Sequence, residues 1–128
     1  MSKAIIHTDA APAAVGPYSQ AVGAQAGRLG FLSGQIGLEP GTGELVSENF
    51  EGQVRQSFAN MQAVIEAAGG SLESIVKLTL FLTDLSKFAS ANAIMADIIP
   101  QPFPARSTIG VASLPKGAQF EVEAIIVV

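Results

Sequence analysis

The sequence predicts a single α+β domain, residues 1–128, in which two helices pack on one face of a sheet of about six strands. Its 128 residues match the length of one ordinary domain. The predicted elements follow in the order β-β-β-α-β-α-β-β, with no internal repeat and no interdomain linker. Two amphipathic helices can cover only one face of such a sheet. The other face needs a different cover, and self-association of the protein would supply it.

The N-terminal part of the chain is expected to form three strands. Residues 3–7 can form a short strand, and an irregular stretch rich in Pro and Gly follows it. Residues 19–26 and 28–35 then read as two strands that meet at Gly27, which predicts a hairpin. The Pro and Gly content of residues 39–44 predicts a turn or an exposed loop.

Two helices are expected in the middle of the chain. The first begins near Ser47 or Asn49 and ends at Gly69 and Gly70. Its apolar residues recur at offsets of three and four and form one stripe: Phe50, Val54, Phe58, Met61, Ile65 and Ala68. The second helix has Asp84 as its N-cap and stops at Pro100. Its predicted inner side consists of Leu85, Phe88, Asn92, Met95 and Ile99.

Three further strands complete the predicted sheet. Residues 74–83 alternate in the manner of a strand, and one face carries Val76, Leu78, Leu80 and Leu82. The opposite face of this strand carries Lys77, Thr79, Phe81 and Thr83. Residues 107–112 and 119–127 form the last two strands.

The composition favours an oligomer and argues against nucleic acid as a partner. Hydrophobic residues make up 48% of the chain and charged residues only 14%, whereas about a quarter is usual for charged residues. A monomer with so few charges would cover its own surface poorly. The formal net charge is −4, and the seven basic residues are scattered from Lys3 to Lys116. Binding of phosphates needs clustered Lys and Arg, so nucleic acid is not expected as a partner.

Several chemistries are excluded by the residues that the chain lacks. It contains no cysteine and a single histidine, His7. Disulfides, thiolate nucleophiles and a His/Cys metal site are therefore excluded, and no metal is expected. A Ser-His-Asp triad would depend on His7 as its only base. No signal-peptide pattern and no apolar run of about 18 residues is present, so a cytoplasmic protein without a membrane partner is expected.

Arg106 is the residue that packing explains least well. It lies in the otherwise uncharged run 103–111. A guanidinium stays protonated in a protein and is costly to bury unpaired, and a planar carboxylate matches its geometry best. The partner is either Glu121 or Glu123 on the neighbouring predicted strand or the carboxylate of a ligand. Glu121 and Glu123 share one face of their strand, and a solvated pair is the simpler reading of them.

Other polar residues lie among apolar ones and are further candidates for a site. They are Tyr18, Ser33, Asn92, Ser107 and Thr108. Tyr18 could equally be a packed aromatic residue, Ser33 a small strand residue, and Asn92 a helix residue that bonds to a loop. Residue type alone therefore assigns none of them a function.

Six motifs, in order and at similar spacing, resemble the Rid/YjgF family over essentially the whole chain. They are residues 16–21 (GPYSQA), 33–36 (SGQI), the helix 53–69, residues 76–84, 103–107 (FPARS) and 121–124 (EVEA). The resemblance implies a chorismate-mutase-like α+β fold with a mixed six-stranded sheet and two helices on one face. It also implies homotrimers with the sites in the clefts between subunits. The pattern is most similar to the RidA branch.

The RidA branch hydrolyses 2-iminobutanoate and 2-iminopropanoate to 2-oxo acids and ammonia, without a cofactor. By resemblance, Arg106 would bind the substrate carboxylate, and Glu121 would position and deprotonate the attacking water. Tyr18, Ser33 and Asn92 would form or support the pocket, together with Ser107 and Thr108. Thr108 stands where the family usually has Cys, so no thiol can act at that position in this chain.

Two other functions are kept as alternatives. The first is a binding or regulatory module that recognises small carboxylates through Arg106 without turnover. The second is an endoribonuclease or translation inhibitor, an activity attributed to some relatives. The acidic net charge and the lone histidine weigh against the second.

Overall fold

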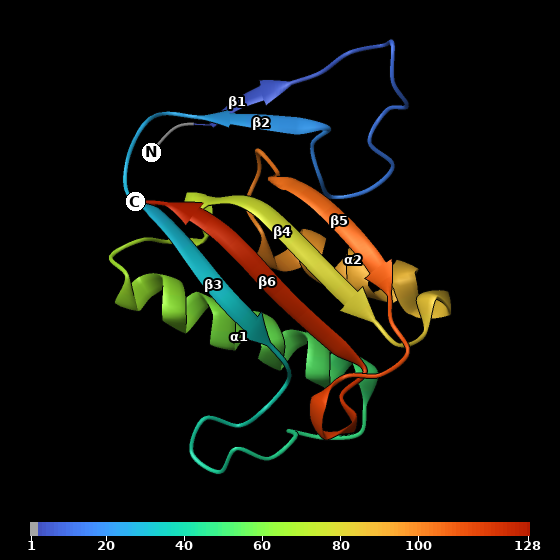
Figure 1. Cartoon of the computed structure of the whole chain (residues 1–128). Helices are drawn as coiled ribbons and strands as arrows, with labels where there is room; N and C mark the ends of the chain where they lie inside the picture. The colour runs from blue at the N-terminus through green and yellow to red at the C-terminus, as the bar shows by residue number, and fades with distance from the viewer. Residues whose placement is uncertain (1–2) are drawn as a thin grey trace.

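The structure, a computed structural model, describes residues 3–128 (Figure 1). It contains the eight predicted helices and strands in the predicted order: β1 (Lys3–Ile6), β2 (Ala21–Ala24), β3 (Leu29–Gln35), α1 (Phe50–Ala67), β4 (Ile75–Leu82), α2 (Phe88–Ile98), β5 (Ala105–Gly110) and β6 (Phe120–Val127). Single 3-10 turns precede β4, α2 and β6. The α+β class is confirmed.

The six strands form two sheets rather than one. β1 and β2 pair with each other, and the remaining four strands form a sheet in the order β3-β6-β4-β5. The larger sheet is mixed, because β4 and β5 are parallel while the other neighbours are antiparallel. Both helices lie on the same side of this sheet, behind it in Figure 1. The prediction of two helices on one face is therefore confirmed.

The predicted hairpin at Gly27 is wrong. β2 pairs with β1, where Ile5 lies opposite Val22. β3 pairs instead with β6, and the Arg28 N–H donates to the Val128 carbonyl at 2.8 Å. The reason is that β6 offers β3 a long, half-buried partner from the far end of the chain. A local sequence pattern carries no information about a partner at that distance.

The apolar stripe of α1 forms the centre of the core, as predicted. Val54, Phe58 and Ile65 are fully buried against the sheet. The side chain of Asn49 caps the helix by accepting from the Gly52 N–H at 2.8 Å. Just beyond the helix, Gly69 has a φ of +89°, a conformation that only glycine adopts easily.

The alternation predicted for β4 holds except at its beginning. Leu78, Leu80 and Leu82 are fully buried, but so is Ile75, while Val76 is only half-buried. A bulge causes this difference, because Ile75 lies opposite Ile126 of β6 whereas Lys77 already lies opposite Ile125. The extra residue in β4 shifts the alternation by one position.

The second helix begins later than predicted. Asp84 caps a 3-10 turn, Leu85–Lys87, through a bond from the Ser86 N–H at 2.9 Å, and α2 starts at Phe88. Leu85 therefore stands outside the helical period and is 52% exposed, which contradicts its assignment to the inner side. Met95 and Ile99 are buried as expected, whereas Phe88 and Asn92 are half-buried.

The sheet face opposite the helices, called the open face below, carries exposed apolar side chains. Phe31 is 72%, Leu29 58% and Ile109 43% exposed. Strand register places them on this face. Phe31 and Leu29 lie opposite Ile125 and Val127 of β6, and Ile109 lies opposite Phe81 of β4. These three partners point away from the helices, on the side of the sheet opposite the buried leucines of β4. An uncovered apolar face of this kind supports the expected self-association. The oligomeric state itself stays a prediction.

Candidate active site

Arg106 extends from the edge of the larger sheet toward α2. It lies on β5, the strand at one end of the sheet order, and its Cα is opposite that of Leu78 on β4. Directly opposed residues share a face of the sheet, and Leu78 is buried beneath the helices. The side chain of Arg106 therefore lies on the helix side of the sheet, where it is half-buried.

Four neutral side chains surround the guanidinium, and we call them with Arg106 the arginine cluster. Nη1 of Arg106 donates to Oδ1 of Asn92 at 2.6 Å and lies 3.8 Å from Sδ of Met95. Its Cζ lies 4.7 Å from the centre of the Tyr18 ring and 5.4 Å from that of Phe88. Tyr18 and Asn92 were predicted site residues, and the structure brings both to Arg106.

Phe88 and Met95 were not identified as site residues from the sequence. A signal was nevertheless present, since they share one stripe of α2 with Asn92 at positions i, i+4 and i+7. That stripe was interpreted as core-facing. All three residues instead contact Arg106, and of them Met95 alone also belongs to the core.

No acidic side chain pairs with Arg106 within residues 3–128. The ion pairs found in this part of the chain are His7 with Asp9 and Arg55 with Asp97. The alternative in which Glu121 or Glu123 neutralises Arg106 is therefore contradicted within one chain. Burial lowers the pKa of Arg106 from its usual value, but a guanidinium remains protonated at neutral pH. The cluster thus holds a positive charge with neutral partners only.

Two polar atoms of β5 are buried without a hydrogen-bond partner. They are Nε of Arg106 and Oγ1 of Thr108. Residues two apart in a strand point to the same face, so both atoms belong to the helix side of β5. A buried donor or acceptor without a partner costs about 1–3 kcal/mol. The described residues offer neither atom a partner, and Thr108 stays a candidate for the site.

The segment with Tyr18 is held against the start of β5. The Ser19 N–H donates to the Pro104 carbonyl at 3.0 Å, and the Ser19 hydroxyl donates to the Phe103 carbonyl at 2.6 Å. Gly16 approaches the cluster so closely that a Cβ there would lie 3.4 Å from Nη2 of Arg106. These contacts explain why the motif around Gly16 and Tyr18 and the motif around Arg106 belong to one site.

Glu121 lies on the other side of the sheet. Its Cα is opposite that of Phe81 on β4, and Phe81 does not share the face of the buried leucines. Glu121 therefore projects from the open face, whereas Arg106 projects from the helix side. The structure does not bring these two residues together within one chain.

The Glu121 carboxyl packs against the backbone of Gly34. A Cβ at Gly34 would overlap Oε2 of Glu121 and would lie 2.7 Å from its Cδ, so only glycine leaves room for the carboxyl in this position. Burial raises the pKa of Glu121 above its ordinary value, and the nearby charge of Glu123 adds to this effect. A raised pKa is typical of a carboxylate that accepts a proton during catalysis.

The two predicted serines also lie on the open face. Ser33 is exposed and stands in β3, one residue before Gly34. Ser107 is exposed as well, and its hydroxyl lies 3.3 Å from Nζ of Lys77. The predicted site residues thus divide into two groups. The arginine cluster and Thr108 lie on the helix side, while Glu121, Ser33 and Ser107 lie on the open face.

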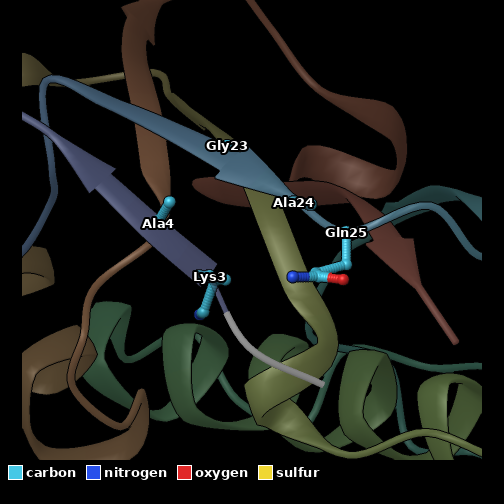
Figure 2. Close-up of a pocket in the computed structure, with 5 residues that line it drawn as sticks. All are labelled: Lys3, Ala4, Gly23, Ala24 and Gln25. Carbon is cyan, nitrogen blue, oxygen red and sulfur yellow. The ribbon is translucent and has the colours of Figure 1, made fainter.

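A depression of about 300 Å³ lies beside the small sheet, away from both groups. Figure 2 shows the residues that line it, which are Lys3, Ala4, Gly23, Ala24 and Gln25. Nζ of Lys3 donates to the Ile75 carbonyl, so this amine already has a partner. None of the lining residues is a predicted site residue. This depression therefore adds nothing to the candidate active site.

Two further observations concern residues 3–128 as a whole. No group of three or more His, Asp or Glu side chains in this range could hold a metal ion. Within the same range, none of the helices combines the length and the apolar character needed to span a membrane.

Comparison with known proteins relates nearly the whole chain to one family. Residues 8–128 match the family model described as Endoribonuclease L-PSP. The chain is 45% identical to a 2-iminobutanoate/2-iminopropanoate deaminase of Dermatophagoides farinae, over 98% of this chain and 97% of that protein. It is 41% identical to the human protein of the same name, over 96% and 88% of the two chains. The crystal structure of RidA from a Psychrobacter species matches with a TM-score of 0.77 and 47% identity, covering 98% of this chain and 99% of the other.

Proposed function

The chain belongs to the Rid/YjgF family, and on this premise we propose that it hydrolyses reactive 2-imino acids to 2-oxo acids and ammonia. The proposed substrates are 2-iminobutanoate and 2-iminopropanoate, which the relatives' names contain. The observation that carries the proposal is the half-buried guanidinium of Arg106, whose described partners are all neutral. Such a cation is ready to bind the carboxylate that both substrates have.

The proposed reaction needs only water and two charged side chains. Arg106 binds the substrate carboxylate and so fixes the position of the adjacent C=N carbon. Glu121 accepts a proton from a water molecule while the water oxygen attacks this carbon. The protonated Glu121 returns this proton to the nitrogen, which gives a neutral tetrahedral intermediate. Glu121 then transfers the hydroxyl proton to the same nitrogen as the C–N bond breaks, so that ammonia leaves and the 2-oxo acid remains. No cofactor takes part in these steps.

The position of Glu121 supports a site shared between subunits. Arg106 and Glu121 project from opposite faces of one sheet, and a substrate of three or four carbons cannot contact both across it. A second subunit that places its open face against the edge strand β5 would bring the two groups together. We therefore include the homotrimer with intersubunit sites in the proposal. The cytoplasmic location is part of the same proposal.

The test of this function is a coupled assay. A pyridoxal-phosphate-dependent dehydratase generates 2-iminobutanoate, and the appearance of 2-oxobutanoate is followed with and without the protein. We expect the protein to raise the rate above that of spontaneous hydrolysis. Stabilisation of the fold by 2-oxobutanoate without any increase in rate would instead support the binding module.

Glu121→Gln is expected to lower kcat by about 100-fold or more, because general acid–base catalysis contributes about 10²–10⁴-fold. Binding of 2-oxobutanoate should persist, since Arg106 is unchanged. The wild-type kcat should fall on acidification as Glu121 becomes protonated, at a pH above the ordinary pKa of a glutamate because burial raises it. The Gln variant should lack this acidic limb in its pH–rate profile.

Gly34→Ala supplies a second variant for the same role. Its methyl group would displace the Glu121 carboxyl without removing it. It should also lower kcat and leave carboxylate binding intact. A wild-type kcat in both variants would rule out Glu121 as the base.

The endoribonuclease alternative is favoured by the description of the matching family model and by the names of some structural neighbours. The formal net charge of −4 opposes binding to RNA. His7, the single histidine, is largely exposed and lies 3.1 Å from Asp9, outside the arginine cluster. RNA cleavage that disappears in the Arg106→Ala variant would overturn our preference for the deaminase.

A further inference from the structure

Phe88 has no role in the hydrophobic core. The core cluster contains most large apolar residues of α1, β4 and β6, together with Ala91, Ile94 and Met95 of α2, and Phe88 is neither in it nor packed against it. The ring is half-buried at the first position of α2. The ring lies against Arg106, whose Cζ is 5.4 Å from the ring centre.

One stripe of α2 provides three different contacts to the same guanidinium. Phe88 presents a ring, Asn92 an amide oxygen at 2.6 Å and Met95 a sulfur at 3.8 Å. These residues are four and three positions apart, so a regular helix places them in one row. The helix therefore acts as a rigid support along which the arginine side chain lies.

The type of contact determines which donors of Arg106 remain available. A guanidinium has five N–H donors, and both recorded polar contacts to α2 involve Nη1. An aromatic ring attracts the cation through its negative face and accepts no directed bond from a particular N–H. Nε is buried without a partner, and Nη2 donates to no side chain or carbonyl within residues 3–128. Nη2, which is not among the buried unpartnered atoms, is therefore the donor that remains accessible to a carboxylate.

We propose that Phe88 is a positioning residue for carboxylate binding, which holds the guanidinium of Arg106 so that its free Nη2 is presented to the ligand. This inference rests on the proposed function only in taking a small 2-imino or 2-oxo acid as the ligand. The contact of Phe88 is with Arg106, and the proposal assigns it no part in the reaction itself. Its effect is on the affinity for the carboxylate and not on the chemical step.

The test uses Phe88→Leu, which keeps an apolar side chain but removes the ring face. Binding of 2-oxobutanoate, measured by calorimetry, should weaken about tenfold, in line with a partly desolvated cation–π contact. KM should rise by a similar factor. The kcat value should stay within about twofold, because the lost contact stabilises the bound substrate and the transition state equally. Phe88→Tyr keeps the ring and should restore both the affinity and the KM.

Two further variants serve as controls for this test. Phe88→Met fills similar space without a ring, and it should show the same loss if Phe88→Leu does not fold. Phe50→Leu removes a ring that lies 5.2 Å from Nζ of Lys87 and is not in contact with Arg106. It should leave the affinity unchanged, although it removes a core residue.

Three results would overturn the inference: wild-type affinity in Phe88→Leu and Phe88→Met, failure of Phe88→Tyr to restore binding, or no binding of 2-oxobutanoate by the wild-type protein. The proposed function fails differently. Wild-type protein that binds 2-oxobutanoate but does not accelerate imine hydrolysis would remove the deaminase and leave the role of Phe88 intact.

Discussion

Arg106→Ala is expected to abolish the release of 2-oxobutanoate above the spontaneous rate. Removal of one partner from a buried charge pair costs about 2–5 kcal/mol, which corresponds to a loss in kcat/KM of about 30-fold to several thousand-fold. Arg106→Lys should also lose most activity, because an ammonium cannot offer the two parallel donors of a guanidinium. The measurement is the coupled assay together with calorimetric binding of 2-oxobutanoate.

The same substitution should leave the fold intact. In the ligand-free chain, burial of the guanidinium destabilises the fold, because no acidic partner offsets the lost hydration and Nε makes no hydrogen bond. We therefore expect the thermal midpoint of Arg106→Ala to equal or exceed that of the wild type. Arg55→Ala is the matched control, since Arg55 is an exposed arginine 3.6 Å from Asp97. It should keep full activity, and normal turnover in Arg106→Ala would refute the assigned role.

Asn92→Asp is expected to weaken carboxylate binding strongly and to stabilise the fold at the same time. The Oδ1 atom of Asn92 lies 2.6 Å from Nη1 of Arg106. A carboxylate oxygen in the same place would neutralise the cation and remove the positive charge that attracts the ligand. We expect affinity for 2-oxobutanoate and kcat/KM to fall by about 100-fold, the effect of losing a charge-assisted contact in a buried site.

The pH dependence distinguishes this explanation from simple damage. The introduced carboxyl would be paired with Arg106, so its pKa should be depressed in the folded state. Its stabilising effect should then be present at neutral pH and be lost as the pH falls through that depressed pKa. The thermal midpoint of the variant should exceed that of the wild type at pH 7, and the difference should shrink on acidification.

Asn92→Ala separates neutralisation from loss of the orienting bond. It leaves the charge of Arg106 unopposed and removes only one hydrogen bond, so it should weaken ligand binding less than Asn92→Asp. It should also give no gain in stability. If Asn92→Asp bound 2-oxobutanoate as tightly as the wild-type protein, the absence of an acidic partner for Arg106 would not matter for ligand binding.

Patterns that depend on neighbouring residues were predictable from the sequence. The apolar stripe of α1, its cap at Asn49 and the buried leucines of β4 all follow from spacings of two to four residues. Predictions failed where a distant segment decides the outcome. The supposed hairpin at Gly27 does not form because the C-terminal strand β6 pairs with β3. Val76 is not buried because a bulge against β6 shifts the start of β4.

The candidate site divides in the same way. From the sequence alone, Arg106 is a cation in an apolar run that requires an anion, and Glu121 is a carboxylate in an apolar strand. Only the tertiary structure shows that neutral side chains of α2 and the Tyr18 segment surround Arg106, and that Glu121 projects from the opposite face. The physical reason is that charge and residue type are properties of the chain. Which groups meet is decided by strand pairing and helix packing between segments that lie far apart in the sequence.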